Sequence, residues 1–162
     1  EALRRGRMPP RRSAQALALL LPLGLIGGAL YSQYVGGLFP CEMCMWQRWP
    51  HYAAIMLAAL SFVVRPGRTA LVWLAALAIA VSGAIGAFHA GVEYGWWEGL
   101  TRCATNFGAG GMTLDSIMNA PLIRCDTPQW TLGGVSLAGF NAIISVVSAV
   151  VILALLAKGR KG

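Results

Sequence analysis

Four long apolar stretches constrain this chain more than any other feature. They cover residues 14–34, 45–64, 69–88 and 135–157. Each has about the 20 residues that a helix needs to cross the hydrocarbon core of a bilayer. A strand of an open sheet would leave its backbone groups unsatisfied there. The sequence therefore predicts an all-α integral membrane protein, a bundle of four transmembrane helices.

Composition excludes a soluble enzyme and a nucleic-acid-binding protein. Apolar residues make up 57% of the chain and charged residues only 12%, whereas about a quarter of the residues of a soluble domain are charged. The net charge is +7, but no basic stripe with interleaved aromatic residues runs through the chain. We therefore expect the lipid bilayer, and no nucleic acid, as a partner. The first apolar stretch is too long for the core of a signal peptide, so we expect it to be retained as a helix.

The basic residues predict the orientation in the membrane. Ten of the thirteen Lys and Arg residues fall in 1–13, 65–68 and 158–162, and five of the six acidic residues fall in the two other connecting segments. Positive charge marks the cytoplasmic side, so both termini are expected there and both longer loops outside. The predicted organisation is a basic tail at 1–13, one membrane domain at 14–157 with outer loops at about 35–44 and 89–134, and a basic tail at 158–162.

Glycines recur within two of the apolar stretches, as Gly24, Gly27 and Gly28 in the first and Gly83 and Gly86 in the third. Small residues let helices approach closely in lipid. We interpret both groups as helix-packing positions rather than as binding residues.

All four cysteines, Cys41, Cys44, Cys103 and Cys125, lie in or beside the outer loops. Disulfides persist outside the cytoplasm and are rare inside it. Four cysteines allow three pairings. Cys41 and Cys44 form a C-x-x-C motif and are close in sequence. This leaves Cys103 and Cys125 as the natural second pair.

The C-x-x-C motif stands where the second apolar stretch begins. The N-terminus of a helix favours a thiolate over a thiol, and a thiolate is the species that attacks a disulfide. Cys41, Cys44 and Arg48 are spaced by three and four residues, so they share one helix face. A guanidinium there would stabilise a thiolate or bind a carbonyl oxygen. His51 lies on a neighbouring part of the same face.

Two other interpretations of the cysteines remain open beside a redox dithiol. One is a structural disulfide with an interfacial arginine, and the other is a zinc site with four thiolate ligands. A C-x-x-C ring is strained as a structural link, and Cys103 and Cys125 are 22 residues apart, unlike the paired knuckles of most zinc sites. The pattern favours redox chemistry without a metal.

Four segments together resemble the disulfide-bond-formation protein B (DsbB) family, and the resemblance extends from about residue 14 to 157. They are the run PCEMCMWQR at 40–48, the run GAFHAGVE at 86–93 with Trp96 and Trp97 after it, Cys125–Asp126, and the run LGGVSLAGFN at 132–141. Members of this family are enzymes of the bacterial inner membrane. They reoxidise a periplasmic DsbA-like thioredoxin-fold protein and pass the electrons to a membrane quinone, either ubiquinone or menaquinone.

The resemblance also implies roles for individual residues. Cys103 and Cys125 would form the loop disulfide that the partner attacks, with Cys103 in the mixed disulfide. Electrons would then pass to the C-x-x-C pair through Cys41, which exchanges with the loop pair.

Cys44 would be the thiolate that faces the quinone. Arg48 would hold a quinone oxygen and favour that thiolate, and His89 matches a family histidine close to the quinone. Within the long loop, segment 112–123 is mildly amphipathic and is expected either as a surface helix or as an ordinary loop.

Two rival functions are kept beside this one. A vitamin-K-epoxide-reductase-like enzyme also places C-x-x-C by a quinone, but its loop pair normally precedes that motif, whereas the motif comes first here. The other rival is a non-catalytic membrane protein with four helices whose disulfides only brace its loops.

Overall fold

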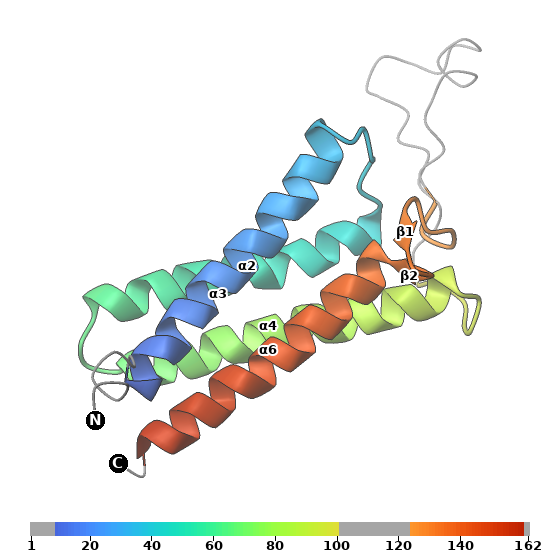
Figure 1. Ribbon diagram of the computed structural model, residues 1–162. Coiled ribbons are helices and arrows are strands. Elements are labelled where there is room, and N and C mark those ends of the chain that lie inside the picture. The colour runs from blue at the N-terminus through green and yellow to red at the C-terminus, as the bar shows by residue number, and fades with distance from the viewer. Residues whose placement is uncertain (1–8, 101–123, 161–162) are drawn as a thin grey trace, which may run out of the picture.

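A computed structural model describes residues 9–100 and 124–160 (Figure 1). Among these residues the prediction of four long helices is confirmed. The elements are α2 (Pro10–Tyr34), α3 (Glu42–Val63), α4 (Arg68–Glu93), β1 (Thr131–Leu132), β2 (Val135–Ser136) and α6 (Leu137–Arg160). Cys103 and the segment 112–123 lie outside the described residues, so the expectations for them remain predictions.

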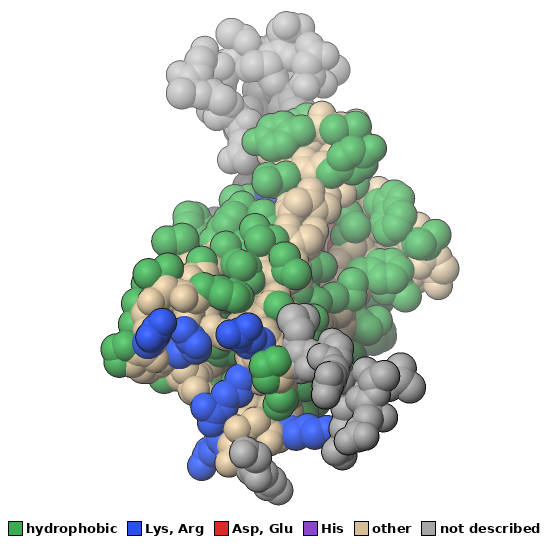
Figure 2. Space-filling model, turned by 60° about the vertical axis from the view of Figure 1, so that its left-hand side comes forward, with side chains coloured by type: hydrophobic (Ala, Val, Ile, Leu, Met, Phe, Trp, Pro, Cys, Tyr) green, Lys and Arg blue, Asp and Glu red, His purple; other side chains and the backbone are tan. Residues whose placement is uncertain are grey.

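Three of the helices, α2, α4 and α6, are long and apolar enough to cross a membrane. Apolar side chains cover much of the outside of the molecule (Figure 2), as lipid-facing surfaces require. Helix α3 is 22 residues long but more polar, because its first half carries Gln47, Arg48 and His51. Its membrane crossing, and the sides on which the loops and termini lie, remain predictions.

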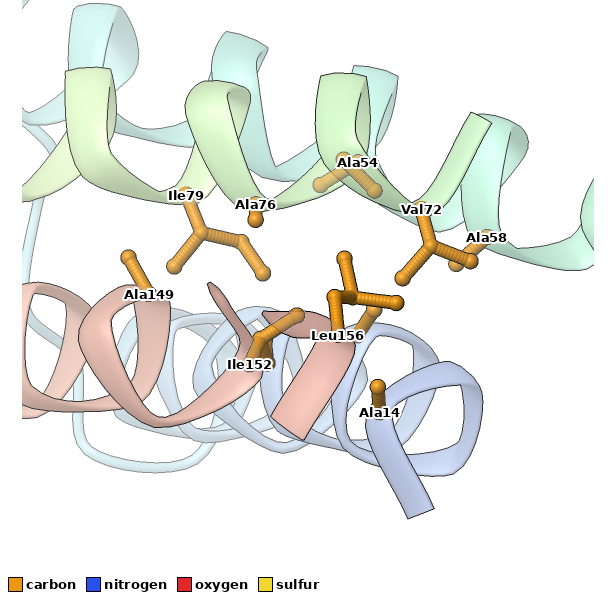
Figure 3. Close-up of a cluster of buried hydrophobic side chains, with 11 residues drawn as sticks. Ala14, Ala54, Ala58, Val72, Ala76, Ile79, Ala149, Ile152 and Leu156 are labelled. Carbon is orange, nitrogen blue, oxygen red and sulfur yellow. The ribbon is translucent and has the colours of Figure 1, made fainter. Parts of the chain in front are cut away.

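Alanines dominate the buried core between the four helices (Figure 3). The core residues are Ala14, Ala18, Ala54, Ala58, Val72, Ala75, Ala76, Ile79, Ala149, Ile152 and Leu156. Helix α4 makes the most extensive packing, against both α3 and α6. Small side chains allow this close approach, which supplies the van der Waals contact that holds helices together in lipid.

The two groups of glycines behave differently. A Cβ atom at Gly83 would lie 2.9 Å from Val146 Cγ2, and one at Gly86 would lie 3.0 Å from the Ala138 carbonyl oxygen, so the packing interpretation holds for α4. It is wrong for α2, because a Cβ atom at Gly24, Gly27 or Gly28 would meet nothing within 4 Å. Gly24 and Gly28 line a cavity instead.

A short hairpin precedes the last helix, which begins at Leu137 and not at 135 as the apolar pattern predicted. Strands β1 and β2 pair antiparallel, and Gly133 and Gly134 between them have φ values of +59° and +82°, which a tight two-residue turn needs. The Tyr94 hydroxyl donates to the Gly134 carbonyl at 2.8 Å and accepts from the Ser136 N–H at 3.0 Å. These bonds tie the start of α6 to the end of α4.

Candidate functional site

A cavity of about 280 Å³ opens between the helices at the end of the bundle that carries the cysteines. All four helices contribute to its wall, together with the segments before α3 and α6. Four of the predicted site residues line it, namely Cys41, Cys44, Arg48 and His89. The structure therefore brings the two cysteines and Arg48, at the start of α3, together with His89 of α4.

Cys41 and Cys44 stand at the start of α3. Cys41 is the N-cap residue, and its Sγ accepts the backbone N–H of Cys44 at 3.2 Å. Its thiol also donates to Cys44 Sγ across 2.7 Å. This hydrogen bond lowers the pKa of Cys44, which precedes the predicted span 45–64, and the charge of Arg48 acts in the same direction. Cys44 is therefore the more acidic thiol of the pair.

Cys125 lies beside Cys41, although the two are far apart in sequence. The sulfurs of Cys41 and Cys125 and a ring nitrogen of His89 all lie within 4.8 Å of one another, and all three residues are buried. The structure thus places one cysteine of the predicted loop pair within reach of the C-x-x-C pair. Its predicted partner, Cys103, lies outside the described residues.

His89 is held by side chains of two other helices. Its Nδ1 accepts from Gln47 Nε2 at 2.8 Å, while Gln47 Oε1 accepts from Asn141 Nδ2 at 2.8 Å. With Nδ1 an acceptor, the neutral ring carries its proton on Nε2, which lies 3.6 Å from Cys41 Sγ. The ring also hydrogen-bonds the backbone of Cys125, so the Nε2–H is shared between that backbone and the Cys41 sulfur.

The network continues into the bundle through His51 and through Ser82 and Asn141, to which the sequence interpretation gave no role. Ser82 donates to the Gln47 carbonyl at 2.8 Å, and Asn141 Oδ1 accepts from His51 Nε2 at 2.9 Å. His51 therefore acts mainly within this network, although it also lines the cavity. The only sequence signal for these residues was their polarity. A polar side chain within an apolar helix costs free energy in the membrane, so it marks a candidate functional position.

Arg48 reaches from α3 across to α2. Its Nη1 donates to Gln33 Oε1 at 2.6 Å and its Nη2 to the Ala29 carbonyl at 3.4 Å. Both acceptors are neutral, and no ion pair involves Arg48 among the residues that the structure describes. Its positive charge is therefore available to an anion or a polarised oxygen in the cavity.

Glu93 is a further site residue that the sequence interpretation did not assign. It follows His89 by one helical turn, with Oε1 at 3.8 Å from His89 Nε2. Its Oε2 is buried and has no hydrogen-bond partner among the described residues. Glu93 is the only carboxylic acid that lines the cavity among these residues.

The thiol cluster also contains donors that a metal ion would accept. Two cysteines and one histidine are a common ligand set for zinc, and Cys41, Cys125 and His89 lie close enough to act together. The sequence interpretation assigned no metal here, so zinc remains an alternative for the reduced protein.

Apolar helices that surround a reactive dithiol, with a third cysteine in reach, define a membrane-bound thiol–disulfide oxidoreductase as the class. Comparisons with known proteins agree with it. The family model "Disulfide bond formation protein DsbB" matches residues 11–155, and the chain belongs to this family. The membership confirms the resemblance seen in the sequence and makes the protein a disulfide-generating membrane oxidoreductase.

Curated relatives match over most of their length. "Disulfide bond formation protein B 1" of Pseudomonas putida is 31% identical, with 90% of this chain and 90% of the relative covered. "Disulfide bond formation protein B" of Verminephrobacter eiseniae is 32% identical, with 94% and 89% covered. The protein of that name from Paracidovorax citrulli is 32% identical, with 94% and 90% covered. No solved structure matches the chain.

Proposed function

We propose that this protein is a protein-dithiol:quinone oxidoreductase of the bacterial inner membrane, which reoxidises a periplasmic DsbA-like thioredoxin-fold protein. The observation that carries the proposal is the meeting of Cys41, Cys44 and Cys125 beside a cavity lined by Arg48, which has no ion pair among the described residues.

The first transfer involves the loop pair. The partner's thiolate attacks the Cys103–Cys125 disulfide at Cys103, and the partner's second thiol resolves the mixed disulfide. The partner leaves oxidised, and the loop pair holds the two electrons as a dithiol. Direct thiol–disulfide exchange of this kind needs only a thiolate and an accessible sulfur.

The second transfer joins the loop pair to the C-x-x-C pair. The Cys125 thiolate attacks Cys41 of the Cys41–Cys44 disulfide and releases the Cys44 thiolate. Cys103 then attacks Cys125, restores the loop disulfide and releases Cys41 as a thiolate. The proximity of Cys41 and Cys125 supports this route. The Nε2–H of His89, which faces the Cys41 sulfur, would stabilise the leaving thiolate.

The cavity suits a quinone in its donors and its shape. Gly24 and Gly28 place no side chain in its α2 wall and have open space in front of them, which leaves room for a planar ring, and Arg48 supplies donors for a carbonyl oxygen. A bound quinone would accept two electrons and two protons from the dithiol and become a quinol. Cys44 would face it as the thiolate, His89 would lie beside it, and Glu93 would hold a proton for delivery.

Activity with purified components tests this proposal. Wild-type protein is expected to oxidise a reduced DsbA-like protein when quinone is supplied. The Cys44→Ser variant is expected to lose quinone reduction while its Cys103–Cys125 disulfide still forms. Quinone-dependent turnover retained in that variant would overturn the assignment, and a wild-type protein that oxidises no partner would instead favour the non-catalytic rival. The match to the DsbB family already disfavours a vitamin-K-epoxide-reductase-like enzyme.

The zinc alternative rests on the same three donors and is tested separately. Elemental analysis of the protein, reduced and exposed to equimolar zinc before desalting, is expected to give far less than one metal per chain. About one zinc per chain, lost in Cys125→Ser, would favour a metal site instead.

A further inference from the structure

A second cavity lies at the opposite end of the bundle from the cysteines, among the basic chain segments. Its volume is about 480 Å³. It is lined by Pro9, Arg11, Arg12, Gln15, Arg65, Gly67, Arg68, Thr69, Val72 and Leu156. Four of these residues are arginines and none is acidic. Figure 2 shows Lys and Arg side chains gathered at this end, below the apolar surface.

The positive charge of this cavity is not neutralised within the described residues. Arg11 Nε donates to the Gly159 carbonyl and Arg68 Nε to the Ser61 carbonyl, each at 3.1 Å, and both acceptors are neutral. For the exposed Arg12 and Arg65, the described part of the chain provides no hydrogen bond or ion pair to the side chain. Four like charges around one cavity repel each other, and an anion bound between them would remove that repulsion.

Two helix N-termini border the same cavity. Helix α2 begins at Pro10 after the N-cap residue Pro9, and α4 begins at Arg68 after the N-cap residue Gly67. Neither N-cap provides a side-chain hydrogen bond to its helix. Pro10 has no N–H, and the N–H groups of Arg12 and Arg68 already donate to the carbonyls of Pro9 and Arg65. Both helix ends still add partial positive charge to that of the arginines.

The surroundings favour a lipid over a free anion. The cavity floor includes Val72 and Leu156, which are 1% exposed or less. Phe62 and Val63, in the last turn of α3 just before Arg65, are 50% and 81% exposed. A charged headgroup site with apolar side chains next to it matches a molecule with a phosphate and acyl chains, whereas a free phosphate would use only the basic part.

We propose that this cavity binds the phosphodiester headgroup of an anionic phospholipid from the adjacent leaflet. Arginine is suited to phosphate, since its planar fork can donate two parallel hydrogen bonds. Basic pockets between membrane helices are a recognised arrangement for anionic headgroups. The site is remote from the thiols, so it stands independently of the proposed electron transfer.

Native mass spectrometry of the full chain tests the proposal. Delipidated protein in detergent is titrated with phosphatidylglycerol, with phosphatidylcholine of the same acyl chains, or with sodium phosphate. Wild-type protein is expected to retain phosphatidylglycerol in preference to phosphatidylcholine. The Arg12→Gln/Arg65→Gln variant is expected to bind it about thirtyfold more weakly, at the usual contribution of a basic residue near an anionic lipid surface.

A matched variant distinguishes binding of the lipid in this cavity from diffuse electrostatic attraction of the lipid to the basic end of the bundle. Lys158→Gln/Arg160→Gln removes the same charge from the last turn of α6, outside the cavity lining, and is expected to bind like wild type. Arg12→Lys/Arg65→Lys keeps the charge and is expected to retain most of the affinity. Equal losses in both glutamine variants would overturn the proposal. Absence of a preference for phosphatidylglycerol would also overturn it, as would sodium phosphate displacing the lipid at equimolar concentration.

Discussion

Gln47→Leu tests whether the hydrogen-bond network around His89 sets the reactivity of the dithiol. In the structure Gln47 is 7% exposed and takes part in three side-chain hydrogen bonds. It donates to His89 Nδ1 at 2.8 Å and to the Met43 carbonyl at 3.3 Å, and it accepts from Asn141 at 2.8 Å. Leucine is similar in volume, so the substitution removes the hydrogen bonds with little change in packing.

The expected loss of stability is modest. Side-chain hydrogen bonds between membrane helices average about 0.6 kcal/mol each. Two of the three join α3 to another helix, so they predict a fall in the free energy of unfolding of about 1 kcal/mol. The substitution should also slow the reaction, and this effect on the rate should not depend on the loss of stability. Without Gln47 the His89 ring loses the bond that fixes its tautomer. A loss of about 1.4 kcal/mol in the stabilisation of the Cys41 thiolate would slow electron transfer from the loop pair, and with it quinone reduction, about tenfold.

Gln15→Leu is the matched control, because Gln15 is also a buried glutamine. Its amide donates to the Ser61 carbonyl at 3.1 Å and to the Ser61 hydroxyl at 3.2 Å, at the end of the bundle remote from the thiols. It should lose about 1 kcal/mol of stability and keep wild-type turnover. Chemical unfolding and stopped-flow quinone reduction measure the two effects. If Gln47→Leu is destabilised but reduces quinone at the wild-type rate, the role given to the network is refuted.

Three further predictions follow from single residues. Arg48→Lys should raise the quinone KM about tenfold in steady-state assays, because one ammonium cannot replace the bidentate guanidinium; an unchanged KM would place the quinone elsewhere. Glu93→Gln should lower the rate of quinol formation by about a hundredfold, the size typical of general acid catalysis, with thiol exchange between the cysteine pairs unaffected. Gly86→Val should cost about 1–3 kcal/mol in the free energy of unfolding by overpacking α4 against α6, whereas Gly27→Ala, with open space around it, should cost little.

The elements of the fold could be predicted because length and apolar composition are properties of continuous segments. Each predicted span corresponds to a helix of the structure, and α3 and α4 extend beyond the apolar stretches to include Cys44 and His89. The hairpin before α6 was missed because Val135 and Ser136 open the apolar stretch 135–157, while Thr131 and Leu132 fell in the predicted loop 89–134. Only the paired glycines of the turn indicated it.

The site could be predicted only in part. Helical spacing brought Cys41, Cys44 and Arg48 onto one face, because that spacing is local. The bonds of Gln47 to His89 and Asn141 join residues 42 and 94 positions apart, and no local pattern shows which buried polar groups meet across a bundle. The position of Cys125 beside Cys41 depends on the same long-range packing.

The central claim is that Cys44 acts as a thiolate facing a quinone, and its most direct test is a visible absorption spectrum. Cys41→Ser keeps Cys44 unpaired and leaves a hydroxyl to donate to it. With quinone added, this variant is expected to show a thiolate–quinone charge-transfer band. The pKa of Cys44 is lowered from its ordinary value of 9.0, chiefly by the hydrogen bond from residue 41, so the band should fade on acidification with a midpoint below 9.0. A band that survives in Cys41→Ser/Cys44→Ser, or no band in Cys41→Ser at any pH, would contradict the claim.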